Sequence, residues 1–438
     1  MGTAATAGGP QGTSATMLAP FVEELDKLAP SFKLHGSRIR IIQTPADFYE
    51  TLKDKIRHAE RRIFLSTLYI GKSEKDLIAT LQTALRTKPD LKLSILADAL
   101  RGTRESPDPC AASLLAPLVT EFGPERVEIR MYHTPNLTGM RKKFIPNRIN
   151  EGWGLQHMKL YGFDDEIILS GANLSTDYFT NRQDRYHMFS SRDITSYFWG
   201  LQEAVCSLSF LVRPSSESAS GFVLDWPTSN KAPSPLENSK QFVADSTKLL
   251  RGLISAGTPP QICGGGNTPN NSLANMTQTQ RHAKPPSQDT GEAPPDTSVY
   301  ILAQMSQLLR PDSSTEQPAL THVLSTLASS PAGLARGSSW TFTAGYFNPA
   351  PSLTRLLLAT VPAGSSGTVI TASPYANGFY RSRGVSGMLP DAYSLLSRRF
   401  LDSVERQRRR IVEEGGSGGG NRGENLPTAV GRQVRHSP

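Results

Sequence analysis

The pattern of hydrophobic and polar positions predicts alternating strands and helices over the first half of the chain. Apolar runs typical of strands occur at 38–42, 62–70, 91–98 and 127–132, and amphipathic runs typical of helices at 21–28, 44–60, 74–86, 114–122 and 194–211. Thr44 before Pro45 is a helix N-cap signature, and Ser73 is expected to cap the following helix. Strands and helices that alternate at this spacing predict a mainly parallel α/β sheet with helices on both faces.

The second half of the chain changes in composition and then returns to the same pattern. Pro, Ser, Gly and Asn dominate 213–297, which predicts a largely disordered insertion with one short helix at 242–253. Helices are expected at 299–309, 318–328 and 351–358, and strands at 338–346 and 367–372. We therefore expect a disordered N-terminus (1–20), a first α/β lobe (21–212), the insertion (213–297), an incomplete second lobe (298–412) and a disordered tail (413–438).

Composition and charge limit the classes of partner. The 438 residues carry a formal net charge of +8, which favours anionic partners such as phospholipid surfaces or nucleotides. The basic residues are not interleaved with aromatic ones, so no nucleic acid is expected. Three cysteines without a C-x-x-C spacing indicate a reducing compartment and no structural zinc. No apolar run is long enough for a transmembrane helix, and the first 20 residues contain no arginine typical of a mitochondrial presequence.

The candidate chemistry lies in one stretch, LQHMKLYGFDDEIILSGANLS, at 155–175. It predicts a hairpin that turns at Asp164 and places His157 and Lys159 on one face of the first strand. A neutral imidazole can attack phosphorus, an ammonium can neutralise phosphate oxygens, and a carboxylate can orient the histidine. The loop from Gly171, with Asn173 and Ser175, supplies small residues and an amide for phosphate oxygens. The stretch therefore predicts phosphoryl transfer.

Several other segments have a functional and an ordinary interpretation. STLYIGKS at 66–73 ends like a P-loop but lacks the first glycine and the glycine-rich loop. Arg101 and Arg104 follow a strand end, where α/β sheets bind ligands, or are ordinary surface charges. The basic run 141–143 is a solvated loop or attracts anionic headgroups. His282 belongs to a second H-x-K-x4-D match, which prolines interrupt, and is interpreted as chance.

The spacing H-x-K-x4-D followed by G-A-N-L-S resembles the HKD signature of the phospholipase D superfamily. More narrowly, GANLS with YFTNRQDRY (178–186), LYIG (68–71), LRGTR (100–104) and ANGFYRSRGVSGMLPDAY (376–393) resembles the eukaryotic phosphatidylglycerophosphate synthases, which are CDP-diacylglycerol–glycerol-3-phosphate 3-phosphatidyltransferases. The resemblance covers most of 20–212 and 340–405. It implies α/β/α sandwich lobes of the phospholipase D type, the second incomplete, and transfer of a phosphatidyl group from CDP-diacylglycerol to sn-glycerol 3-phosphate with release of CMP.

The resemblance also implies roles for residues and a place of action. His157 would form a phosphatidyl-histidine, Lys159 would hold phosphate oxygens and Asp164 would orient the histidine, while Asn173, Ser175, Arg185 and Arg104 would bind substrate. The chemistry requires no cofactor or metal, although a divalent cation could stimulate nucleotide binding. The implied location is the mitochondrion, in peripheral contact with the anionic inner membrane.

The family joins two HKD motifs in one site, and no second motif follows Arg410. Three interpretations stay open: a truncated chain with weak activity, a pseudoenzyme, or a homodimer in which two copies of His157 meet. The alternatives in function are a phosphodiesterase or nuclease of the same superfamily, and a non-catalytic module that binds lipid or nucleotide.

Overall fold

The computed structural model describes residues 19–146, 150–255, 294–329, 338–360 and 366–416. The described residues form two compact units. The larger unit runs from Ala29 to Ser314, and the smaller unit combines the N-terminal helix with the residues from Thr315 onwards. Parts of the regions predicted as disordered, namely 1–18, 256–293 and 417–438, lie outside the described residues, as does His282.

A mixed sheet is the centre of the larger unit. Within the described residues it has nine strands in the order β10-β9-β5-β4-β3-β6-β7-β8-β2. Their bounds are β2 Ile39–Ile42, β3 Arg62–Ser66, β4 Lys92–Asp98, β5 Val127–Tyr132, β6 Leu160–Phe163, β7 Glu166–Ser170, β8 Tyr186–Ser190, β9 Phe210–Pro214 and β10 Phe222–Asp225. Only β3–β4 and β4–β5 pair in parallel. The expectation of a mainly parallel sheet is wrong, because β6 to β8 follow one another antiparallel and β9 returns antiparallel to β5.

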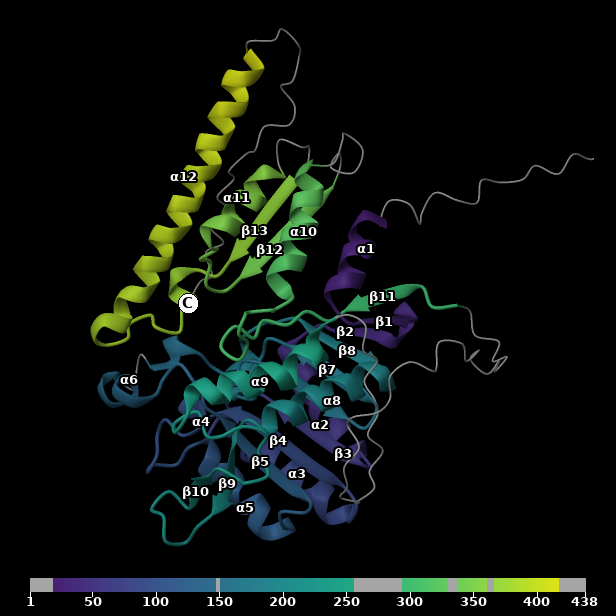
Figure 1. Ribbon diagram of the computed structural model, residues 1–438, viewed down its shortest axis with the longest axis vertical. Coiled ribbons are helices and arrows are strands. Elements are labelled where there is room, and N and C mark those ends of the chain that lie inside the picture. The colour runs from purple at the N-terminus through teal and green to yellow at the C-terminus, as the bar shows by residue number, and fades with distance from the viewer. Residues whose placement is uncertain (1–18, 147–149, 256–293, 330–337, 361–365, 417–438) are drawn as a thin grey trace, which may run out of the picture. The chain divides into compact units, whose positions relative to one another are not determined.

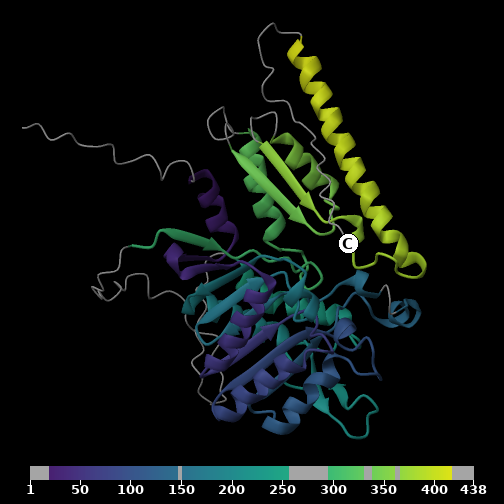
Figure 2. The same ribbon diagram turned by 180° about the vertical axis from the view of Figure 1, so that it is seen from behind.

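Helices cover both faces of this sheet, as predicted (Figures 1 and 2). One core contains residues of α2 Pro45–His58, α3 Lys75–Thr87 and α5 Ala111–Phe122, and the other those of α8 Arg192–Cys206 and α9 Ser239–Ile254. Strand alternation divides the side chains between the two cores: Ile63 and Leu65 enter the first, and Phe64 enters the second. The Phe64 ring lies over Gly162 of β6, where an added Cβ would be 1.9 Å from the ring.

Local signals explain most element boundaries. Thr44 caps α2 as expected, since its side chain accepts a hydrogen bond from the Asp47 amide at 3.1 Å. Ser73 does not cap α3. Glu74 occupies the N-cap position, and the Ser73 hydroxyl donates to the Glu74 carboxylate at 3.0 Å.

Two predicted segments differ because distant pairing decides them. The helix expected to reach residue 211 ends at Cys206. The described residues 213–255 were predicted as part of the insertion at 213–297, but they contain the end of β9, all of β10 and α9, and belong to the larger unit. Phe242, Leu250 and Ile254 of α9 are fully buried. The helix predicted from Val299 is instead β11 Thr297–Tyr300, which pairs antiparallel with β1 Ser31–Leu34, and the chain to Ser314 belongs to the larger unit.

The smaller unit contains the elements predicted for the start of a second α/β lobe (Figure 1). They are α10 Glu316–Ser329, β12 Ser339–Ala344, α11 Pro351–Ala359 and β13 Ser366–Thr371. The unit also contains α12 Leu389–Gly416, which was not predicted, and α1 Ala19–Leu28, which was expected in the first lobe. Strands β12 and β13 pair in parallel, as a strand–helix–strand unit requires. The helix α12 continues beyond residue 412, where the tail was expected to begin.

Candidate active site

The segment that carries His157 and Lys159 precedes the strand on which it was expected. The predicted hairpin is present as β6 and β7 with its turn at Asp164 and Asp165, yet β6 begins at Leu160 rather than at Leu155. Hydrogen bonds of Gln156, the preceding residue, hold the backbone next to His157. The Gln156 amide donates to the buried Asp98 carboxylate at 2.9 Å, and the Gln156 side chain donates to the Thr67 and Leu96 carbonyls. The segment is therefore anchored to the ends of β3 and β4.

His157 and Lys159 form a direct pair. Lys159 Nζ lies 2.9 Å from His157 Nδ1 and donates to the His157 carbonyl at 2.8 Å. Lys159 is buried, and burial lowers its pKa to about 7, while Asp184 opposes that shift. His157 is open to solvent on one side, but desolvation by the surrounding protein, together with the Lys159 charge, lowers its pKa to about 4. The imidazole is therefore neutral at neutral pH, as a nucleophile requires.

The G-A-N-L-S loop is held from two sides. The Gly171 amide donates to Asp184 Oδ1 at 3.1 Å, and the amide and hydroxyl of Thr176 both donate to Glu74 Oε1 at 2.8 Å. Asn173 is 4% exposed, and its Oδ1 has no hydrogen-bond partner among the described residues. An unpaired buried amide oxygen is costly unless a ligand or water satisfies it. Ser175 is buried at the N-cap of α7 Thr176–Thr180, so Asn173 is the loop side chain with an open polar atom.

Asp164 is not placed beside His157. Its carboxylate accepts the backbone amides of Glu60, Arg61 and Arg62 at 2.8, 2.9 and 3.0 Å. It lies at the opposite end of β6 from Lys159, in the turn, with φ of 51°. The expectation that Asp164 orients the histidine is corrected: the carboxylate ties the β6–β7 turn to the start of β3.

The two predicted substrate-binding arginines have different surroundings. Arg104 and Arg101 both pair with the Glu151 carboxylate, which lines the same pocket as His157. Arg104 therefore reaches the site through an acidic partner rather than as an open cation. Arg185 is exposed and does not line this pocket. It follows Asp184, whose carboxylate accepts the Gly171 amide.

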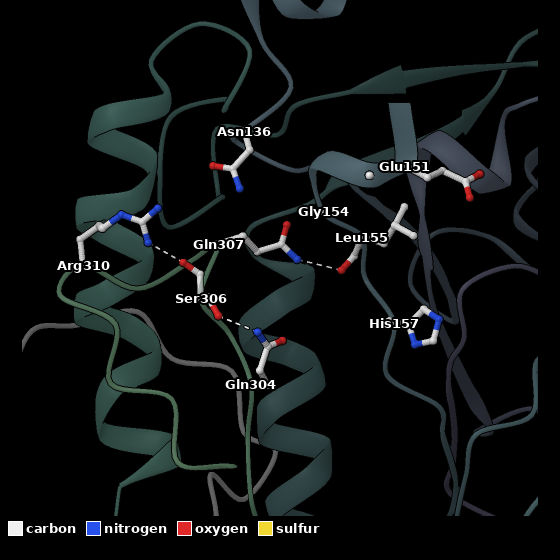
Figure 3. Close-up of a pocket in the computed structure, with 10 residues that line it drawn as sticks. Asn136, Glu151, Gly154, Leu155, His157, Gln304, Ser306, Gln307 and Arg310 are labelled. Carbon is white, nitrogen blue, oxygen red and sulfur yellow. Dashed lines mark hydrogen bonds between the residues drawn. The ribbon is translucent and has the colours of Figure 1, made fainter. Parts of the chain in front are cut away.

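The structure adds a polar pocket wall that the sequence did not predict (Figure 3). The cavity, of about 440 Å³, is lined by Asn136, Glu151, Gly152, Gly154, Leu155, His157, Gln304, Ser306, Gln307 and Arg310. The residues from Gln304 onwards follow β11, within the segment predicted as a helix. The β-branched residues of TSVY at 297–300 were a strand signal, but no local signal marks Gln304–Arg310 as part of a site.

The described residues contain neither a candidate membrane span nor a candidate metal cluster. None of their helices is long and apolar enough to cross a membrane. No group of three or more His, Cys, Asp or Glu side chains in the described ranges is arranged to hold a metal ion.

Comparison with known proteins gives close relatives. No family model matches the chain. It is 41% identical to the CDP-diacylglycerol–glycerol-3-phosphate 3-phosphatidyltransferase of Saccharomyces cerevisiae, with 90% of this chain and 71% of the relative covered. Identity to the protein of the same name in Schizosaccharomyces pombe is 38%, over 92% and 80% of the two chains. Identity to the human mitochondrial protein is 34%, over 86% and 64%.

The fold has a solved counterpart. The phosphatidylserine synthase of Haemophilus influenzae Rd KW20 superposes with a TM-score of 0.56 at 16% identity, covering 89% of this chain and 74% of the other. At this identity the match shows the fold alone, and it agrees with the predicted α/β class. The sequence identities to the fungal proteins, over most of both chains, show that this chain belongs to the CDP-diacylglycerol–glycerol-3-phosphate 3-phosphatidyltransferase family.

Proposed function

We propose that the chain transfers the phosphatidyl group of CDP-diacylglycerol to sn-glycerol 3-phosphate and releases CMP. The observation that carries the proposal is the neutral His157 at 2.9 Å from Lys159, in a chain whose relatives are named for this reaction. The reaction moves one phosphorus between two oxygen leaving groups, so a nucleophile and a charged neighbour are the groups that it needs.

The geometry supports a two-step transfer. Lys159 faces Nδ1, so Nε2 is the nitrogen available to attack, provided that Nδ1 carries the proton. A neutral Lys159 amine can accept that hydrogen bond, and its lowered pKa keeps a share of the amine neutral at pH 7. Nε2 attacks the phosphorus attached to diacylglycerol, the bond to the CMP oxygen breaks, and the Nδ1 proton passes to Lys159. The resulting ammonium, with Asn173, stabilises the phosphate oxygens.

The second step restores the histidine. The hydroxyl of glycerol 3-phosphate attacks the phosphatidyl-histidine and releases its proton to solvent, and the P–N bond breaks. The Lys159 ammonium returns its proton to Nδ1, which restores the neutral histidine and the neutral amine. No cofactor enters either step, so CMP release at saturating CDP-diacylglycerol should be unchanged by EDTA. A divalent cation that assists nucleotide binding would instead lower the KM for CDP-diacylglycerol.

Activity assays separate this function from its rivals. With CDP-diacylglycerol in mixed micelles, CMP release should depend on glycerol 3-phosphate and yield phosphatidylglycerophosphate. Release at the same rate without the acceptor, with phosphatidic acid as product, would favour a phosphodiesterase. Substrate binding without CMP release, at every protein concentration, would favour a non-catalytic module, whereas activity that rises with the dimer fraction would favour a homodimer.

We also propose peripheral contact with an anionic membrane through α6 Gly139–Phe144. Its Arg141, Lys142 and Lys143 lie between Met140 and Phe144, which are 69% and 66% exposed. Exposed apolar side chains beside basic ones suit the boundary of headgroups and acyl chains. Flotation with cardiolipin-containing vesicles should fall in Phe144→Ser and Lys143→Gln but not in Lys248→Gln, a control lysine that is 78% exposed. Equal flotation of all variants would refute this surface.

The location proposed for the chain is the mitochondrion, peripheral to the inner membrane. The names of the human, chicken and mouse relatives include the word mitochondrial. Carbonate extraction of isolated mitochondria should release the chain from the membrane fraction, and recovery in another organelle would contradict the assignment.

A further inference from the structure

The wall of the active-site pocket opposite His157 is hydrophilic. Of the residues that line the cavity, Leu155 is the only one with an apolar side chain. The wall consists of Gln304, Ser306, Gln307 and Arg310, which we call the polar wall (Figure 3). Hydroxyl and phosphate groups find hydrogen-bond donors and acceptors in a cavity lined mainly by polar side chains.

Gln307 connects this wall to the catalytic segment. Its Nε2 donates to the Leu155 carbonyl at 2.8 Å, two residues before His157. Its Oε1 is buried and has no hydrogen-bond partner among the described residues. The backbone at Gly154 has φ of 132°, and a Cβ there would be 2.3 Å from the same Oε1, so the amide is tightly packed. Because Nε2 already donates to the Leu155 carbonyl, Oε1 is the remaining acceptor, and a ligand hydroxyl or amine can donate to it.

Arg310 gives the wall a positive charge. Its Nη1 donates to the carbonyls of Ser306 and Leu309, which fixes the guanidinium group. Its Nε and Nη2 have no hydrogen-bond partner among the described residues, and the residue is exposed. Asp312 is the nearby acidic group, and its Oδ1 accepts hydrogen bonds from the amide and hydroxyl of Ser314. The Ser314 hydroxyl is the main cause that lowers the pKa of Asp312, and the Arg310 charge adds a smaller contribution. The remaining guanidinium donors suit a phosphate.

We propose that the polar wall is a binding subsite for a phosphorylated polyol, with Arg310 on the phosphate and Gln307 Oε1 on a hydroxyl. This inference rests on the proposed function and deepens it. Both water-soluble molecules of that reaction, glycerol 3-phosphate and the ribose phosphate of CMP, have this chemistry. The subsite places either molecule in the same cavity as His157, where it would act as acceptor or leaving group.

Direct binding tests the subsite without any turnover. We would titrate the 438-residue chain with sn-glycerol 3-phosphate and, separately, with CMP by isothermal calorimetry. Arg310→Gln should weaken one of them by about 10- to 100-fold, since hydrogen bonds to charged groups contribute about 1.5–3 kcal/mol. Arg310→Lys should recover part of the affinity. Arg86→Gln, in α3 and outside the pocket, is the control and should bind as the wild type does.

The outcomes separate the two sources of the ligand. Loss of glycerol 3-phosphate binding alone assigns the wall to the acceptor, and loss of CMP binding alone assigns it to the nucleotide. If circular dichroism shows that Arg310→Gln does not fold, Gln304→Leu, at an exposed position of the polar wall, replaces it and should weaken binding of one of the two ligands. The proposal is overturned if the wild type binds neither ligand, or if the folded variants bind both as tightly as wild type. A wild-type chain that binds these ligands but releases no CMP would contradict the proposed function and leave the subsite intact.

Discussion

Replacing Asp164 by alanine should reduce stability rather than chemistry. The change removes the acceptor of three backbone amides at 2.8, 2.9 and 3.0 Å. Each hydrogen bond to a charged acceptor contributes about 1.5–3 kcal/mol, but the side chain is 23% exposed and water replaces part of that. Alanine also tolerates φ of 51° less well than aspartate, at a cost of about 1 kcal/mol. The expected loss in the free energy of unfolding of the larger unit is about 3–5 kcal/mol.

Asp164→Asn is the matched variant. Asparagine tolerates the same backbone conformation and keeps one carbonyl acceptor for the Arg61 and Arg62 amides, so a loss of about 1–2 kcal/mol is expected. Urea unfolding followed by circular dichroism measures both losses, and CMP release at a temperature where each variant is folded measures the chemistry. If Asp164 instead orients His157, activity of the folded alanine variant would fall by about 10²–10⁴ with little loss of stability, and our reasoning would be refuted.

Three further changes test other parts of the structure. In wild type, the rate of CMP release should fall as pH decreases through about 7, where Lys159 becomes protonated. Lys159→Gln should be slower and should not show this fall in its pH–rate profile. A fall near pH 4 would indicate that His157 is the titrating group instead. Gly162→Ala should lower the free energy of unfolding in urea by about 1–3 kcal/mol, because the new methyl group meets the Phe64 ring, and an unchanged midpoint would contradict that packing. Burial raises the pKa of Asp98 to about 7 in the fold, so its contribution to stability is present below the ordinary pKa near 4 and is lost as pH rises through about 7. The melting temperature should therefore fall more between pH 5 and pH 8 in wild type than in Asp98→Asn. Equal pH dependence of the two melting temperatures would exclude Asp98 as the titrating group.

Local sequence patterns predicted the elements whose signals are local. The apolar runs of β3, β4 and β5, the Thr44 cap and the hairpin turn at Asp164 depend on residues close in the chain, and the structure confirms them. Local reasoning also paired His157 with Lys159, and their side chains do lie 2.9 Å apart, although the strand on which they were expected begins only at Leu160.

Contacts between distant residues explain the rest. The Asp164 carboxylate binds amides 102 to 104 residues away, which no motif spacing reveals. Thr297–Tyr300 is a strand because it pairs with β1, more than 260 residues earlier, and this pairing carries the polar wall to the site. Residues 213–255 have the composition of a linker, yet α9 buries Phe242 in the second core.

Trapping the covalent intermediate tests the central claim most directly. The chain would be mixed with CDP-diacylglycerol in the absence of glycerol 3-phosphate, quenched at alkaline pH to preserve the P–N bond, and analysed by peptide mass spectrometry. We predict a phosphatidyl adduct on His157, formed with stoichiometric CMP and lost when glycerol 3-phosphate is added. His157→Ala should form neither adduct nor CMP. Acceptor-dependent CMP release from His157→Ala, or an adduct on another residue, would contradict the account.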